Sequence, residues 1–183
     1  NDGLRMVSPA GVVTTLIAAG TFTALVGVAV SAAGDIYVSD GGGFKVHAYQ
    51  VTPAAPTLSA SAPTLAAQTW VAGSGVSAIK EGSLAVAQFH SHHGITYDTA
   101  NDELIVCEMQ GHVVRRVTLQ GRVNSWVGNG AAVSTPGIRL AASMKGPTGS
   151  AVDASGDGYI TEFAGCTVSK VTAGGTVSFL AGS

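Results

Sequence analysis

Residues 94–108 read GITYDTANDELIVCE, and two other stretches of the chain follow the same pattern. They are GVAVSAAGDIYVSD, from Gly27, and GSAVDASGDGYITE, from Gly149. Each copy opens on a glycine, passes through a turn rich in Ala, Asn, Ser, Gly and Asp, and ends on an acidic residue after a short apolar run. Apolar runs separated by turn-forming residues predict a pair of antiparallel strands.

A second half-unit follows these stretches. It reads HVVRRVTLQGRVNSWVG from His112 and CTVSKVTAGGTVSFLAG from Cys166, and the chain opens on a further copy, LRMVSPAGVVTTLIA. Apolar and polar residues alternate within these copies, as they do along strands with two different faces. In each copy a large apolar residue stands five positions after a glycine: Leu16, Trp126 and Leu180.

The remaining copy, FKVHAYQVT, is interrupted after Val51 and resumes at QTWVAGSG, where we place Trp70 at the repeat position of Leu16 and Trp126. Each full unit therefore predicts four short strands. Four antiparallel strands repeated at roughly 40–60 residues are typical of the blades of a β-propeller. Because blades pack face to face, both faces of each sheet are buried, and this accounts for 46% hydrophobic and only 11% charged residues.

The two best-preserved units resemble the NHL repeat. They are AVAQFHSHHGITYDTANDELIVCEMQGHVVRRVTLQGRVNSWVGNG, residues 85–130, and SMKGPTGSAVDASGDGYITEFAGCTVSKVTAGGTVSFLAGS, residues 143–183. The resemblance implies an all-β fold, a β-propeller of NHL-type four-stranded antiparallel blades. Two features depart from the repeat. The usual proline is present as Pro147 but is His92 in the middle unit, and the third-strand arginines, Arg115 and Arg116, occur only there.

The repeats divide the chain, taken as one propeller segment over residues 1–183, into four parts. These are a half blade at 1–20, a blade at 21–75 that carries an insert at 52–67, and blades at 76–130 and 131–183. The resemblance implies closure with about six blades. Three and a half blades cannot close a ring alone. We therefore expect an incomplete ring whose open strand edges recruit further blades, copies of the chain or other proteins.

The insert, TPAAPTLSASAPTLAA, contains only Leu besides Ala, Ser, Thr and Pro. Two interpretations stay open: a flexible surface loop between two strands, or an O-glycosylated stretch. In the second, the candidate acceptors are Thr52, Thr57, Ser59, Ser61 and Thr64. The chain has no Asn-x-Ser/Thr sequence for N-glycosylation. The low charge and this insert favour an extracellular or cell-surface location.

Four histidines and one glutamate are expected at one end of the middle blade. His90, His92 and His93 precede its first strand, and His112 lies with Glu108 near the turn between its second and third strands. In a propeller these two segments meet at the same end of the blade. His90, His93, His112 and Glu108 are therefore candidate ligands of Zn²⁺, which takes nitrogen and carboxylate donors. The alternative is a solvated, histidine-rich loop.

The NHL resemblance extends to the peptidyl-hydroxyglycine amidating lyases, which are similar to this fold and bind a catalytic zinc through single histidines from separate blades. His93 occupies the place of such a ligand, directly after the position of the blade's proline. The corresponding residues of the other two blades are Val26 and Thr148, which cannot bind zinc. The resemblance thus implies one ligand of three.

One acidic residue recurs in every unit, at Asp40, Glu108 and Glu162. A position repeated in each blade predicts a repeated structural task, such as accepting backbone N–H groups at a turn. Arg115 and Arg116 are candidates to pair with Glu108 or Glu162 on neighbouring blades.

The tryptophans and cysteines are expected to serve the packing of the blades. Trp70 and Trp126 predict core between blades because they share one repeat position. Cys107 and Cys166 fall near the turns between second and third strands of adjacent blades. They form one disulfide if the fold brings them together, and otherwise two buried thiols.

Several functional classes are disfavoured. The net charge of −2, with nine Lys and Arg, leaves no basic surface for nucleic acid. The uncharged segment from Leu16 to Gly34 is long enough to span a membrane, but Thr, Ser and Gly interrupt it and part of it matches the repeats. The chain shows no nucleophile elbow, phosphate-binding loop or serine–histidine–aspartate order. We expect no cofactor.

These observations predict a non-enzymatic β-propeller module for interaction or structure. We expect protein partners or further copies or blades of the same protein, with attached glycans, in a larger extracellular or cell-surface protein or a filamentous assembly. The alternative is a metal-dependent enzyme of the amidating-lyase type that uses His90, His93 and His112.

Overall fold

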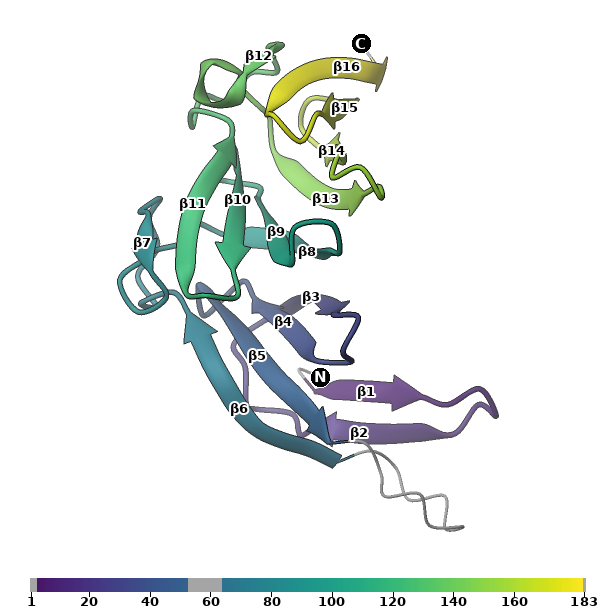
Figure 1. Cartoon of the computed structure of the whole chain (residues 1–183). Helices are drawn as coiled ribbons and strands as arrows, with labels where there is room; N and C mark the ends of the chain where they lie inside the picture. Colours follow the sequence, from purple (N-terminus) through teal and green to yellow (C-terminus); the bar gives the residue numbers. More distant parts are fainter. Residues whose placement is uncertain (1–2, 53–63, 183) are drawn as a thin grey trace.

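The computed structural model describes residues 3–52 and 64–182, and within them it contains β-strands and one short 3₁₀ turn, η1 (Arg139–Ala141). The strands form a two-stranded hairpin followed by three larger antiparallel sheets. Figure 1 shows these sheets following one another along a curved stack, from the hairpin near the N-terminus to the sheet that holds the C-terminus. The predicted all-β architecture of repeated antiparallel blades is confirmed.

Within the hairpin and within each set of four blade strands, the spatial order follows the chain. The N-terminal hairpin pairs β1 (Leu4–Val7) with β2 (Val13–Ile17). The first blade contains β3 (Leu25–Val30), β4 (Ile36–Asp40), β5 (Lys45–Thr52) and β6 (Thr64–Ala72). The second contains β8 (His92–Asp98), β9 (Glu103–Glu108), β10 (Val113–Thr118) and β11 (Arg122–Val127). The third contains β13 (Pro147–Val152), β14 (Gly158–Glu162), β15 (Thr167–Val171) and β16 (Thr176–Gly182).

The second and third blades hold one strand more than the predicted four. β7 (Gly82–Ser83) pairs with β11, and β12 (Gly137–Ile138) pairs with β16. Each of these two-residue strands comes from the segment that precedes its own blade and covers the outer edge of the sheet. Strands this short show no alternation in the sequence, which is why the repeats did not predict them.

The interrupted hairpin of the first blade is longer than the repeats predict. β5 runs to Thr52 and β6 begins at Thr64, and these two residues pair at the far end of the ladder. The two ends of the predicted insert at 52–67 are therefore strand, which corrects its bounds. The rest of the insert, with the candidate acceptors Thr57, Ser59 and Ser61, lies outside the described residues.

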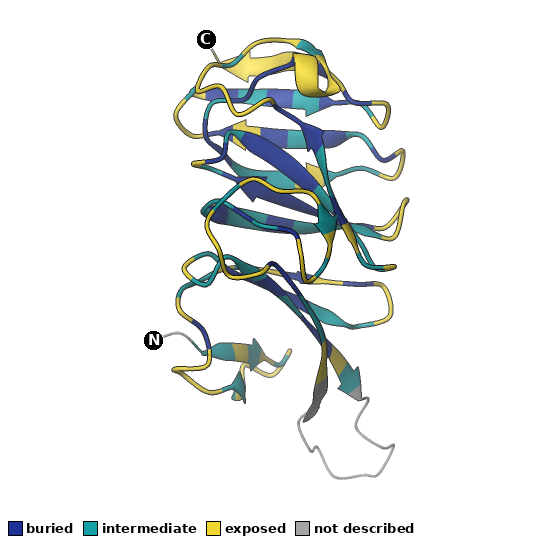
Figure 2. Ribbon diagram, turned by 90° about the vertical axis from the view of Figure 1, so that its left-hand side faces the viewer, coloured by how far each residue is buried: buried dark blue, intermediate teal, exposed yellow. Residues whose placement is uncertain are grey.

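Apolar side chains from facing sheets form the core, and Figure 2 shows the buried residues concentrated inside the stack. Tyr37 of the first blade packs with Leu104 of the second. Trp126 of the second blade packs with Ile160 of the third. Trp70 contacts the first of these interfaces, with its ring 5.8 Å from that of Tyr37. The prediction that both tryptophans lie between blades is confirmed.

The two tryptophans do not, however, share one structural position. Leu16, Trp126 and Leu180 are each skipped by the pairing register of a fourth strand, so that they sit in a β-bulge. Trp70 lies directly opposite Ala48 instead. Its placement with Leu16 and Trp126 is therefore wrong, because the bulges of the first blade fall in a different part of the ladder, around Tyr49.

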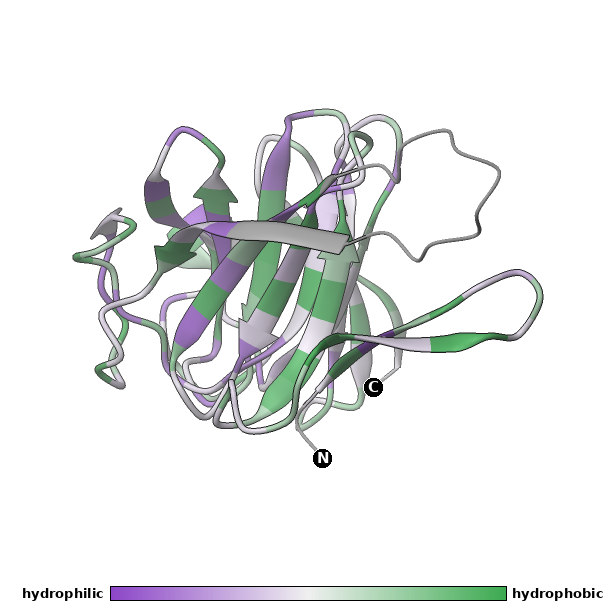
Figure 3. Cartoon of the chain, turned by 90° about the horizontal axis from the view of Figure 1, so that it is seen from below, coloured by the Kyte–Doolittle hydropathy of each residue, from purple (hydrophilic) through white to green (hydrophobic). Residues whose placement is uncertain are grey.

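Both ends of the stack leave apolar positions open. Val28 and Ile95 occupy the same place in the first and second blades, opposite Val38 and Val106, yet Val28 is 53% exposed and Ile95 only 7%. At the other end, Leu180 is 60% exposed while its counterpart Trp126 is 1% exposed. Figure 3 shows hydrophobic bands along the strands at the N-terminal end. The ring is incomplete, and the positions that blades cover inside the stack are uncovered at its ends.

The segment from Leu16 to Gly34 contributes to β2 and β3. Among the residues described, no helix has the length and hydropathy to cross a membrane.

Candidate functional site

A buried carboxylate marks the same end of every blade. Asp40, Glu108 and Glu162 are each the last residue of a second strand and each is at most 4% exposed. The first residues of the neighbouring first and third strands lie directly opposite them. The repeat therefore gathers one acidic group per blade where the chain enters the first strand.

The same backbone group donates to this carboxylate in every blade: the N–H of the residue two positions before the first strand. These donors are Thr23, His90 and Lys145, at 3.1, 2.6 and 2.7 Å from oxygens of Asp40, Glu108 and Glu162. Each hydrogen bond ties the entering segment to the end of the second strand. The prediction that the recurring acidic residues accept backbone N–H groups is confirmed.

The side chain that approaches the carboxylate from the third strand differs between blades. His47 Nε2 lies 4.0 Å from Asp40, Arg115 Nη1 lies 2.7 Å from Glu108, and the Ser169 hydroxyl donates to Glu162. All three residues are third in their strands. Only the middle blade makes a fully buried ion pair there, with both side chains 0% exposed.

The two neighbouring arginines of β10 face opposite sides of the sheet, as successive strand residues do. Arg115 pairs with Glu108 of its own blade and also donates to the carbonyls of Lys80 and Gln88. Arg116 lies over the ring of Trp126, with Cζ 4.2 Å from its centre. The predicted pairing of Arg115 with Glu108 is confirmed, but the pair lies within one sheet, so the expectation that it joins neighbouring blades is wrong.

Glu108 is held as a structural group. Burial raises the pKa of its carboxyl group to about 7, while Arg115 and the N–H of His90 oppose this rise. Both carboxylate oxygens are engaged, Oε1 by Arg115 and Oε2 by His90. The arrangement fastens the entering segment and the third strand to one carboxylate, and it leaves neither oxygen free for a ligand.

The predicted zinc ligands are not brought together. Glu108 is held by Arg115, and His112 Nδ1 accepts the backbone N–H of Gly146 in the third blade at 3.1 Å. Over residues 3–52 and 64–182, no three His, Cys, Asp or Glu side chains are arranged to hold a metal ion. His90, His93, His112 and Glu108 therefore do not form the predicted metal site. Glu108 and His112 instead hold neighbouring segments of the chain together.

The strand register supports the assignment of equivalent positions that the comparison with the amidating lyases used. Val26, His93 and Thr148 each lie where the register shifts near the start of a first strand. They are equivalent positions of the three blades, and only one of them holds an imidazole.

His92, which replaces the usual proline, joins two blades from a fully buried position. Its Nε2 donates to the carbonyl of Lys45 in the first blade at 3.0 Å. Its ring lies 5.2 Å from that of Phe89. Burial lowers the pKa of His92 to about 4, although Lys45 and Asp40 oppose this change. The imidazole therefore stays neutral in the folded protein across the range in which a free histidine becomes charged.

This geometry predicts a pH dependence of stability that belongs to His92. Between about pH 6.5 and pH 4 the unfolded chain binds a proton at His92 that the folded chain does not. The free energy of unfolding must therefore fall by about 1.4 kcal/mol per pH unit as the pH decreases through this range. Urea unfolding of the native protein and of His92→Gln should show this slope in the difference between the two. An unchanged difference from pH 7 to pH 4 would contradict the assignment.

Cys107 and Cys166 are both free thiols, so the expected disulfide is not formed. Cys107 lies in the core between the second and third blades, and burial raises its pKa to about 12. Cys166 is exposed at a turn, which also corrects the alternative of two buried thiols. The two residues occupy different repeat positions. Cys107 lies one residue before Glu108 at the end of the second strand, whereas Cys166 directly precedes the third strand of its blade.

The repeats did not predict the hydroxyl groups that complete the carboxylate position of the third blade. Ser169 and Ser134 both donate to Glu162. Ser169 could have been found from the sequence, because it aligns with Arg115 in the repeat. No repeat signal points to Ser134, which lies in the irregular segment between blades.

The comparisons with known proteins identify the fold. No protein-family model matches the chain, and no curated protein sequence matches it. Among solved structures, a streptogramin B lyase is similar at 17% identity and a TM-score of 0.62 over 98% of this chain. An auxiliary nutrient binding protein from Bacteroides ovatus is similar at 18% identity and a TM-score of 0.68 over 100% of this chain. A nidogen/laminin complex is similar at 14% identity and a TM-score of 0.58 over 92% of this chain. These likenesses show the β-propeller fold and leave the NHL family a prediction.

The chain spans only part of these structures. It covers 47% of the streptogramin B lyase, 42% of the nutrient binding protein and 52% of the nidogen/laminin chain. The matched proteins are thus about twice as long as this arc of blades.

Proposed function

We propose that this chain is a non-enzymatic interaction module, an arc of a β-propeller that is completed by further blades. The observation that carries the proposal is the difference in exposure between equivalent positions. Leu180 and Val28, at the two ends of the stack, are 60% and 53% exposed, whereas Trp126 and Ile95, inside it, are 1% and 7% exposed. The repeat supplies the same apolar positions at its ends as in its interior.

The two ends fit different occupants. The third blade carries all of its strands, so its open face fits a complete four-stranded blade. The N-terminal hairpin has the bulge of a fourth strand at Leu16, so β1 and β2 correspond to the outer two strands of a blade. Two further strands along β1 would complete that blade and cover Val28 and Val30, which is 55% exposed. The additional length of the similar structures supports such a completion.

We place the module outside the cell or at its surface, within a larger protein or filamentous assembly. The low content of charged residues and the Ala/Ser/Thr/Pro-rich stretch at 52–67 support this location, as does the similarity to a protein complex of nidogen with laminin. O-linked glycans on this stretch remain part of the proposal. Intact-mass analysis of native material before and after removal of O-glycans tests it.

The docking proposal predicts association of the isolated chain through its open faces. In sedimentation velocity over a concentration series, the native chain should associate. Leu180→Asp and Val28→Asp should each weaken this association by roughly tenfold or more, because a charge is costly to bury against apolar residues. Val133→Asp is the matched control, since Val133 is 48% exposed and lies in the segment before the third blade. A native chain that stays monomeric throughout, or variants that associate as the native chain does, would overturn the proposal.

A further inference from the structure

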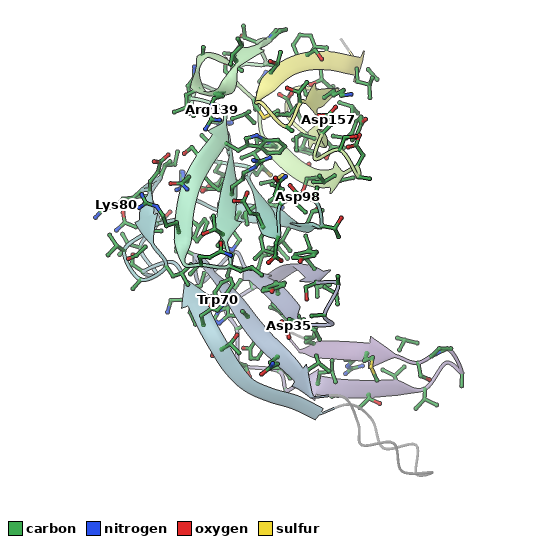
Figure 4. The ribbon with its side chains drawn as sticks, in the orientation of Figure 1. Asp35, Trp70, Lys80, Asp98, Arg139 and Asp157 are labelled. Carbon is green, nitrogen blue, oxygen red and sulfur yellow. The ribbon has the colours of Figure 1, made fainter. Side chains whose placement is uncertain are left out.

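A pocket of about 400 Å³ lies at the outer rim of the interface between the second and third blades. Strands β9, β10 and β11 form its floor, and η1 covers one side. Its charged lining consists of Glu81, Glu103, Arg116 and Arg139, and Trp126 and Asn124 contribute to the rest. Glu103 begins β9, so the pocket lies at the opposite end of that strand from Glu108. Figure 4 shows Arg139 beside the end of β11.

The charged groups of this pocket are poorly satisfied by one another. The Nε atom of Arg116 lies 3.6 Å from Glu103 Oε2, which is too far for a hydrogen bond, and its Nη2 lies 4.0 Å from Asp98. Among the described residues, Arg116 Nε and Nη2, Glu103 Oε2 and the indole N–H of Trp126 are buried without a hydrogen-bond partner. Buried polar groups in folded proteins are almost always paired, so this cluster of unpaired atoms is an unusual feature of the pocket wall.

Other contacts hold the charged side chains of the pocket in place, although these side chains make few hydrogen bonds with one another. The guanidinium group of Arg116 stacks on Trp126, which is itself 1% exposed, and this fixes its plane. Glu81 accepts the backbone N–H of Ser125 at 2.9 Å, and this bond lowers the pKa of its carboxyl group. The backbone of Arg139 is bonded to Gly175, whose carbonyl accepts its N–H at 2.7 Å. The pocket thus presents charges of both signs, of which Arg116 and Glu81 are held by direct side-chain contacts.

The balance of charge selects the class of ligand. Two arginines and two glutamates line the pocket, so a simple anion would be attracted by one pair and repelled by the other, and a simple cation likewise. A molecule that carries both charges satisfies all four. A pocket of this size takes a small organic molecule.

We propose that this pocket binds a small zwitterion, an α-amino acid or a molecule with the same charged groups. Its carboxylate lies between Arg116 and Arg139, and its ammonium group faces Glu103 and Glu81. Ligand binding here is separate from the docking of further blades, because the pocket lies within the chain, between two blades that are both complete.

Three probes of matched size test the charge requirement: L-alanine, propionate and n-propylamine. Isothermal titration calorimetry of the native chain should detect L-alanine and show propionate and n-propylamine to bind at least about tenfold more weakly, as expected for the loss of one charged partner. In a Trp70→Phe background, where Trp126 is the remaining tryptophan, L-alanine should also change the fluorescence emission. Propionate binding as tightly as L-alanine would overturn the zwitterion, and the absence of binding by all three would overturn the site.

Two substitutions locate the binding. Arg139→Gln should weaken the binding of L-alanine by roughly tenfold. The fold is retained, because Arg139 is exposed and lies outside the core. Arg5→Gln is the matched control, since Arg5 is an exposed arginine of the distant hairpin. Glu81→Gln should weaken the binding of L-alanine and should not weaken the binding of propionate, because it removes a negative charge that repels the anion. Equal affinities of native, Arg139→Gln and Arg5→Gln proteins for L-alanine would show that the pocket is not where it binds.

Discussion

Replacing Arg115 with methionine is expected to destabilise the protein by about 3–5 kcal/mol, the usual result of leaving a buried charge without its partner. Arg115 is 0% exposed, and its removal leaves Oε1 of the Glu108 carboxylate without its donor and takes one hydrogen bond from each of the carbonyls of Lys80 and Gln88. Urea unfolding at neutral pH measures the effect. Arg5→Met is the matched control and should change stability by less than about 0.5 kcal/mol, because Arg5 is exposed.

The loss should depend on pH with a definite sign. Without Arg115, Glu108 has to be buried in its neutral form, which is available only below its folded pKa. The penalty of Arg115→Met should therefore be smaller at pH 5 than at pH 8, and the double variant Arg115→Met/Glu108→Gln should recover part of the stability at pH 8. If Arg115→Met proved as mild as Arg5→Met at pH 8, the buried pair would not be what holds this blade together.

Replacing Gly94 with alanine is expected to cost about 3 kcal/mol, since the new methyl group has no space. The first strands of the second and third blades approach so closely here that a Cβ on Gly94 would overlap the backbone carbonyl of Thr148. Backbone atoms of a neighbouring strand cannot move aside as a flexible side chain can. Thermal or urea unfolding measures the change.

Gly149 provides a matched control, because it occupies the position of Gly94 in the third blade. A Cβ there would meet only the Thr161 hydroxyl of the same blade, at 2.9 Å, since no blade covers the next face. Gly149→Ala should therefore be clearly milder than Gly94→Ala in this chain. Equal losses for the two substitutions would mean that close approach of neighbouring blades is not the reason for this repeated glycine.

Much of the fold could be predicted because its determinants repeat. The glycine that opens each unit, the acidic residue that ends each second strand and the bulged residues Leu16, Trp126 and Leu180 recur at fixed spacing, and each recurrence reports one structural task. Trp70 shows the limit of this reasoning. It resembles Trp126 in type and spacing, but the bulges of its own hairpin lie elsewhere in the ladder. The position of a bulge depends on strand pairing, which spacing alone does not reveal.

The candidate site was harder to predict because side-chain partners come from different blades and loops. The sequence places His90, His112 and Glu108 near one end of a blade, and the structure agrees. It does not show that Arg115 and a backbone N–H occupy both oxygens of Glu108, nor that His112 accepts from Gly146. Such partners are set by the direction of each side chain across the sheet. The two-residue strands β7 and β12 and the pocket beside Arg139 are formed in part by segments between the repeats. These segments have no sequence periodicity from which their structure could be predicted.

The most direct test of the central claim is electron microscopy of the protein isolated under native conditions, combined with its intact mass. We expect closed rings in which this chain forms an arc, with Leu180 and Val28 covered by neighbouring strands. Single arcs of three and a half blades, monodisperse and with both end faces open to solvent, would contradict it.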